Sequence, residues 1–143
     1  MPAIRSKSRG WALQALYAWE SRGEPVPLRA FLSQFLSERR VSGRARDYII
    51  ELIEHVADHR EAIDRRLQDC LHNWRLERLS VIDRNVLRIG AAELLYLPEV
   101  PPRVAIQEAI LLAEKYGTAQ SPRFVNGVMD ALMRARPATG EDS

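Results

Sequence analysis

The chain has 143 residues, of which 46% are hydrophobic and 28% charged, with a formal net charge of +2. This length supports one domain, or two tightly packed subdomains, with a substantial core. No run approaches the ~20 apolar residues of a membrane span. No apolar segment follows the basic start as in a secretory signal, and the single cysteine excludes an internal disulfide. These features are typical of a cytoplasmic protein that does not enter a membrane.

The first predicted helix begins with a basic segment, since residues 1–10 contain Arg5, Lys7 and Arg9 but no acidic residue. Arg5 and Arg9 are four residues apart and therefore share a helical face, with Lys7 to one side. Tyr17 follows two turns after Arg9, and an aromatic ring near such cations is common in proteins that bind single-stranded RNA. The residues alone favour the simpler alternative, a solvated terminus with Tyr17 in the core.

Three amphipathic segments follow, after a turn at 23–27 that is rich in glycine and proline. Residues 28–36 carry apolar side chains at the i, i+3, i+4, i+7, i+8 spacing of a helix, and 45–57 and 60–73 repeat it. The last two segments are either separate helices or one kinked unit. Cys70 falls on the apolar face of the third segment, which favours a buried thiol.

A histidine pair in this region raises one alternative function. Glu51, His55 and His59 follow one another at four-residue intervals, so a small metal-dependent enzyme could use them as ligands. No H-E-x-x-H signature accompanies them, and a solvated helix face is the favoured interpretation. The chain also lacks a phosphate-binding loop, a dinucleotide fingerprint and a nucleophile elbow, so no cofactor and no catalytic residue is predicted.

Ser80 is predicted to open the next helix as its N-cap, with Asp83 three residues later in the manner of a capping box. Arg84 and Arg88 share a face of that helix. The residues alone favour a salt-linked solvent face for Asp83 and Arg84, with Asp83 as the carboxylate at the helix start. Glu93 lies within an apolar run, where a structural hydrogen bond is the favoured interpretation.

Two further helices are predicted near the C-terminus. Prolines at 98–102 end one apolar run and start a helix that closes at Gly117, where a left-handed cap is expected. Ser121-Pro122 is then expected to start the last helix. There, Phe124 beside Arg123 is either an exposed ring that could stack on a base or a core side chain. Gly127 costs this helix roughly 1 kcal/mol relative to alanine, so close approach of a second helix is expected.

Helical periodicity in almost every segment, without sustained alternation, predicts an all-α chain of about seven amphipathic helices. We expect a single domain at 1–136, with a natural division near 73–79 that gives subdomains of roughly 1–74 and 75–136. The acidic residues that follow the last helix predict a short disordered tail at 137–143.

Three blocks in order along the chain resemble the NusB family of bacterial transcription antitermination factors. The strongest is P-x-x-V-A-I-x-E-A-I at 101–110, followed by F-V-N-G-V at 124–128. Arg9 with A-L-Q-A-L-Y at 12–17 is similar to the family's first helix. The similarity to its fifth helix rests on Asp83-Arg84, Val86-Leu87-Arg88 and Glu93-Leu94. The resemblance covers most of the chain and implies two small packed helical bundles.

The resemblance implies a function in assembly rather than in catalysis. A protein of this family holds boxA-type single-stranded RNA of rRNA leader transcripts beside NusE, a small-subunit ribosomal protein. It thereby acts indirectly on elongating RNA polymerase. Some members form homodimers, and an rRNA-processing or ribosome-assembly chaperone of the same fold is an alternative function. The RNA-binding residues that the resemblance implies here are Arg5, Lys7, Arg9, Tyr17, Asp83, Arg84, Arg123 and Phe124.

Overall fold

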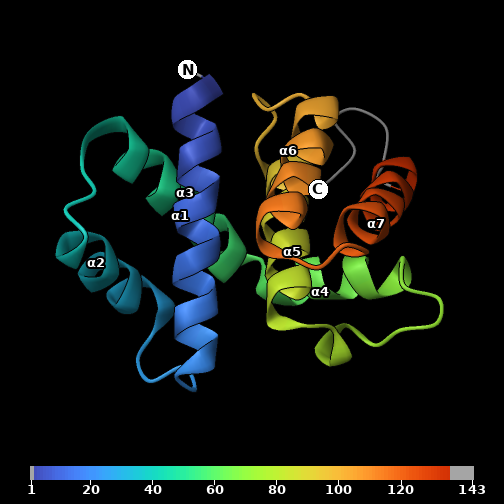
Figure 1. The fold of residues 1–143 in the computed structure, drawn as a ribbon, viewed down its shortest axis with the longest axis horizontal. Coiled ribbons are helices and arrows are strands. Elements are labelled where there is room, and N and C mark those ends of the chain that lie inside the picture. Colours follow the sequence, from blue (N-terminus) through green and yellow to red (C-terminus); the bar gives the residue numbers. More distant parts are fainter. Residues whose placement is uncertain (1, 136–143) are drawn as a thin grey trace.

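The computed structural model describes residues 2–135, so the tail predicted at 137–143 lies outside the described residues. Within this range the chain forms seven α-helices and one short 3₁₀ helix (Figure 1), and the all-α prediction is confirmed. None of these helices has the length and apolar character needed to cross a membrane. The elements are α1 (Pro2–Ser21), α2 (Leu28–Glu38), α3 (Gly43–Asp58), α4 (Arg60–Asp69), the 3₁₀ helix (Leu76–Arg78), α5 (Val81–Tyr96), α6 (Pro102–Tyr116) and α7 (Ser121–Ala135).

The central helix of the fold is α5, in which residues 85–94 are all buried. It packs against α1, α3, α4, α6 and α7. On one side of the molecule α1, α2 and α3 pack together, and on the other side α6 and α7 pack against α5 (Figure 1). Because α1 contacts both α5 and α6, the two groups of helices share one continuous hydrophobic core.

Helices α3 and α4 follow each other with only His59 between them, which agrees with the expectation of two helices or one kinked unit. α4 packs mainly against α5 and also contacts α7. Packing therefore groups α4 with the C-terminal helices, whereas the sequence analysis placed it in the subdomain at 1–74. Cys70, directly after α4, is partly rather than fully buried, and burial raises the pKa of its thiol.

Two glycines differ from what their sequence context predicts. Gly117 has φ −95° and ψ −161°, an extended conformation instead of the expected left-handed cap. A Cβ there would lie 2.5 Å from Ser121 Oγ, so the missing side chain lets α7 start close to the end of α6. The predicted close approach at Gly127 is wrong, because, apart from α7 itself, no atom of residues 2–135 lies within 4 Å of a Cβ built there. Helices do approach closely at Gly90, whose Cβ would lie 2.8 Å from the end of Met129.

Candidate nucleic-acid interface

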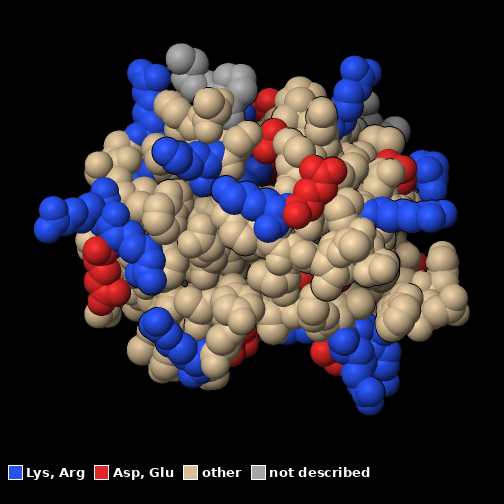
Figure 2. Space-filling model, viewed as in Figure 1, with Lys and Arg blue, Asp and Glu red and all other residues tan. Residues whose placement is uncertain are grey.

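The face of the molecule that presents α1 and α6 carries an excess of cations. Figure 2 shows lysine and arginine side chains over more of this face than aspartate and glutamate. The net charge of the whole chain is only +2, so attraction for a polyanion depends on how these charges are distributed. Whether a cation can bind a phosphate therefore depends on its exposure and on the partners that it already has within the protein.

Arg9 lies where α1 crosses α5 and α6, and it is only 2% exposed. Its Nε donates to both carboxylate oxygens of Glu93 on α5, at 2.7 and 2.9 Å. Its Nη1 lies 3.2 Å from Oε1 of Glu108 on α6. The structure thus gives Arg9 partners inside the protein, where the resemblance implied a contact with RNA. A carboxylate 84 positions further along the chain draws this guanidinium into the core.

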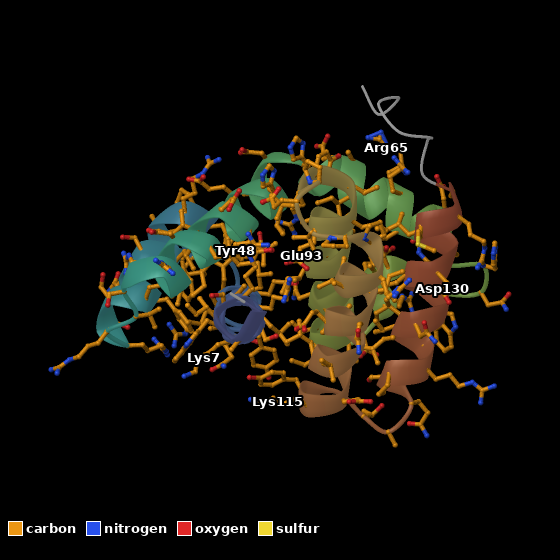
Figure 3. The ribbon with its side chains drawn as sticks, turned by 90° about the horizontal axis from the view of Figure 1, so that it is seen from above. Lys7, Tyr48, Arg65, Glu93, Lys115 and Asp130 are labelled. Atoms are coloured by element: carbon orange, nitrogen blue, oxygen red, sulfur yellow. The ribbon has the colours of Figure 1, made fainter. Side chains whose placement is uncertain are left out.

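Glu93 is the buried acceptor at the centre of this cluster, where Figure 3 labels it beside Tyr48. Burial raises the pKa of Glu93, and the charge of Arg9 and the hydrogen bond from Tyr48 only partly oppose that rise. The Tyr48 hydroxyl donates to the same carboxylate, so burial and the adjacent negative charge raise the pKa of Tyr48. These contacts join α1, α3 and α5, and the predicted structural role of Glu93 is confirmed.

Arg5 and Lys7 are more accessible than Arg9. The Arg5 guanidinium lies 4.8 Å from the centre of the Tyr48 ring, a cation–π contact, and Arg5 is partly exposed. Lys7 is exposed. Of the three predicted cations of α1, Lys7 is thus the most available to an external phosphate.

A second cluster joins the other end of α1 to the start of α5. Glu20 accepts from Arg84 at 2.8 Å, from Asn85 at 2.6 Å and from Arg88 at 3.1 Å. Arg88 also donates to Asp64 on α4 at 2.9 and 3.0 Å. Burial would raise the pKa of Glu20, but the hydrogen bonds from Arg84 and Asn85 and the charges of Arg84 and Arg88 hold it below its ordinary value. Arg84, with a side chain 12% exposed, is therefore mainly occupied within the protein.

The start of α5 has the predicted N-cap. Ser80 Oγ accepts a hydrogen bond from the backbone N–H of Asp83 at 3.1 Å. The Asp83 side chain is partly buried, and its Oδ1 has no hydrogen-bond partner among the described residues. Asp83 and Arg84 thus lie at a half-buried edge of the molecule, next to the C-terminal end of α1.

The remaining candidates differ in how far their side chains are exposed to solvent. Tyr17 is 46% exposed, so its ring is not part of the core. Arg123 is exposed on the first turn of α7. Phe124 is partly buried and packs against the core. It is therefore neither a fully exposed ring nor a fully buried core side chain, the two alternatives that its sequence position left open.

A groove between α1 and α6 joins Lys7 to residues that were not among the contacts expected from the sequence. It encloses about 440 Å³, and Lys7, Gln14, Lys115 and Tyr116 are among its lining residues. The Gln14 amide donates to the Tyr116 hydroxyl at 3.2 Å, which joins residues 102 positions apart in the chain. Lys7 and Lys115 lie on the same side of the molecule, opposite Arg65 (Figure 3). No local sequence pattern signals a groove assembled from such distant segments.

The residues of the metal alternative are arranged as a stack of rings. The ring centres of His55 and His59 lie 5.7 Å apart and nearly parallel, and His59 stacks on Tyr96 at 3.8 Å. Stacked rings face one another instead of directing their nitrogens at a common point, and Glu51 is exposed. Among residues 2–135, no three His, Cys, Asp or Glu side chains are grouped as metal ligands.

The chain is similar in sequence and fold to proteins of the NusB family. The NusB family model matches residues 6–134. The transcription antitermination protein NusB of Nocardioides sp. is 40% identical over 136 residues, which cover 95% of this chain and 98% of that protein. The NusB of Sorangium cellulosum is 42% identical over 90% of each chain.

Two solved structures extend the similarity to the fold. T. maritima NusB superimposes with a TM-score of 0.85 at 35% identity and covers 92% of both chains. A structure of the antitermination factors NusB and NusE in complex with double-stranded RNA gives a TM-score of 0.84 at 29% identity. That match covers 95% of this chain and all of the solved one.

Proposed function

The chain belongs to the NusB family of transcription antitermination factors, and from this premise we propose that it binds boxA-type RNA of rRNA leader transcripts together with NusE. In this function it is an assembly factor and not an enzyme. By holding nascent RNA beside a ribosomal protein, it helps elongating RNA polymerase resist termination. The polymerase is reached indirectly, through the assembled complex.

The observation that carries the proposal is the solved complex of a family member with NusE and RNA, which shares this chain's fold over nearly its whole length. The cation-rich face with α1 and α6 supports it physically (Figure 2). Attraction of exposed lysines and arginines for phosphates is long-range and independent of base sequence. A surface with few free cations gains affinity when a second protein adds its own contacts.

We assign the RNA contacts first to Lys7 and Arg123, because both side chains are exposed. Arg5 is a partly exposed third cation, and the exposed ring of Tyr17 can meet either a base or the protein partner. Arg9 is not a contact in this proposal. It positions α1 by holding the helix against α5 and α6.

A salt titration tests the proposal. Binding of a boxA-type RNA oligonucleotide is measured over a range of salt concentrations, with and without NusE. The double variant Lys7→Ala/Arg123→Ala should give a log K against log salt slope shallower by about 1.4, taking ~0.7 for each phosphate contact on a single strand. Arg65→Ala is the matched control, since Arg65 is exposed on the side of the molecule opposite Lys7 (Figure 3). Its slope should equal that of the parent protein.

Two outcomes would contradict the proposal. The first is an affinity for boxA-type RNA no higher than for a scrambled sequence, even in the presence of NusE. That result would favour the alternative of a ribosome-assembly chaperone with the same fold. The second is an equal change of slope in the Arg65 control and the double variant, which would place the RNA elsewhere.

A further inference from the structure

Gly10, which has no side chain, forms part of the wall of the groove between α1 and α6. Gly10 is buried in the middle of the 20-residue helix α1, where glycine costs roughly 1 kcal/mol relative to alanine. Outside α1 itself, the hydroxyl oxygen of Tyr116 on α6 is the one atom of the described residues within 4 Å of a Cβ built there, at 3.3 Å. A Cβ at that distance would be tighter than an ordinary contact, so the end of the Tyr116 side chain would have to shift by a few tenths of an ångström. What its missing side chain provides is space beside Tyr116 in the groove.

The groove combines a flat ring with groups that donate and accept hydrogen bonds. Tyr116 and the partly buried Trp11 provide aromatic surface, and Leu111, which is 47% exposed, adds an apolar edge. The Gln14 amide reaches the Tyr116 hydroxyl at 3.2 Å in an exposed position, where either group can exchange its partner for a ligand. A volume of about 440 Å³ is within the range of ~300–1,000 Å³ that small organic groups occupy in proteins.

Two positive side chains and one negative side chain line the groove. Lys7 and Lys115, the only lysines of the chain, line it from α1 and α6 and lie on the same side of the molecule (Figure 3). Glu108 lines it as well, with a side chain 18% exposed. Arg9 and Ser6 both bind its Oε1, at 3.2 and 2.8 Å, which leaves Oε2 without a donor among the described residues and able to accept from a ligand.

We propose that this groove binds one unpaired nucleobase of the RNA, and that the base carries an exocyclic amino group. The two lysines hold the flanking phosphates, the ring of Tyr116 stacks on the base, and Gln14 bonds its edge. The Glu108 carboxylate only accepts, so it pairs with the amino group of cytosine, adenine or guanine. It repels the carbonyl oxygens that dominate the edge of uracil. The inference rests on the proposed RNA-binding function and assigns a specificity site within it.

Gly10→Ala is the most direct test, because binding and stability should respond in opposite directions. The new Cβ narrows the groove and displaces the Tyr116 hydroxyl, while alanine favours the helix. We expect the melting temperature to be unchanged or higher, and RNA affinity to fall about tenfold, the scale of one stacked base. Loss of folding cannot produce that combination.

A second pair of variants tests the hydrogen bond. Gln14→Leu keeps the size of the side chain and removes the amide, so RNA binding should weaken about threefold to tenfold. Gln107→Leu is the matched control. Gln107 is an exposed glutamine like Gln14, but it lies on α6 and lines the separate groove between α6 and α7. This control should bind RNA like the parent protein.

The base itself is identified by a thermodynamic cycle. Each nucleotide of the RNA is replaced in turn by an abasic one, and each RNA is titrated with the parent protein and with Gly10→Ala. At one position the two changes should not add, since either alone removes the same contact. At that position cytosine should bind more tightly than uracil.

The outcomes distinguish the two levels of inference. If the parent protein does not bind the RNA, the proposed function fails. If the parent binds but the two changes add at every position, RNA binding stands and the base site is refuted. If the groove variants lose affinity for NusE or self-association while keeping RNA affinity, the groove is a protein-docking surface and the proposal is overturned.

Discussion

Replacing Arg9 by alanine tests whether this arginine holds the two groups of helices together or serves as an RNA contact. The change removes a guanidinium that donates to Glu93 at 2.7 and 2.9 Å and lies 3.2 Å from Glu108. Glu93 is 1% exposed, and among the described residues its carboxylate would keep only the Tyr48 hydroxyl as a hydrogen-bond donor. A carboxylate left in that position has lost the charge that compensates its burial.

The magnitude follows from that burial. Removing one partner of a buried ion pair costs about 3–5 kcal/mol, a large part of the ~5–15 kcal/mol that stabilises a typical domain. The loss should depend on pH, because burial already raises the pKa of Glu93 and the loss of Arg9 raises it further. A raised folded-state pKa gives stability that is present below the unfolded pKa and is lost as pH rises through the folded one. The destabilisation by Arg9→Ala should therefore be larger at pH 8 than at pH 5.

Urea unfolding followed by far-UV circular dichroism measures this change, with Lys7→Ala as the matched control. Lys7 is exposed on the same helix, so its substitution should alter stability by no more than about 0.5 kcal/mol. RNA titrations should show the reverse pattern. Folded Arg9→Ala keeps the parent's salt slope, whereas Lys7→Ala is shallower by about 0.7. A stability loss below about 1 kcal/mol in Arg9→Ala would refute the reasoning about the buried pair.

Three further changes test local features of the fold. Gly127→Ala should raise the free energy of unfolding by up to about 1 kcal/mol, because its Cβ meets no atom within 4 Å, and a lower melting temperature would contradict this. Gly117→Ala should lower it by roughly 1–3 kcal/mol, because its Cβ would lie 2.5 Å from Ser121 Oγ and 2.9 Å from the Ala113 carbonyl oxygen. A urea midpoint unchanged by Gly117→Ala would show that the turn between α6 and α7 can shift to accommodate the new Cβ. Glu20→Gln should destabilise the protein at neutral pH and flatten its acid unfolding curve, because the pKa of Glu20 is lowered from an ordinary value of 4.5. Its stabilising effect is present above that value and is lost as pH falls through the lowered pKa, so parallel curves for the two proteins would exclude this role.

The helices could be predicted from the sequence because their signals are local. The apolar stripe at 28–36 repeats at the helical period, and Leu28, Phe31, Leu32, Phe35 and Leu36 are the buried residues of α2. Ser80 likewise caps α5 through a backbone N–H three residues away. Such features need no knowledge of the remaining fold.

The candidate site was less predictable because exposure depends on residues far along the chain. Arg9 is basic like Lys7, and only the carboxylates of Glu93 and Glu108 decide that it is buried. The environment of a helical glycine is equally non-local. Gly127 faces open space, while Gly90, in a less conspicuous context, is the one pressed against Met129.

The geometry of α1 nevertheless separates its structural face from its candidate RNA face. Successive residues of an α-helix are about 100° apart, so Lys7 lies roughly 160° from Arg5 around the axis, while Arg9 lies close to Arg5. Lys7, Gln14 and Tyr17 fall on one side, and all three are exposed over a length of ~15 Å. Arg5 and Arg9 both lie over the Tyr48 ring, on the side that packs against the protein. The basic segment thus has a structural side and a candidate RNA-binding side, because Lys7 points away from Arg5 and Arg9. Arg9 fixes the helix against α5 and α6, and this holds Lys7 and Gln14 beside Lys115 and Tyr116 of α6.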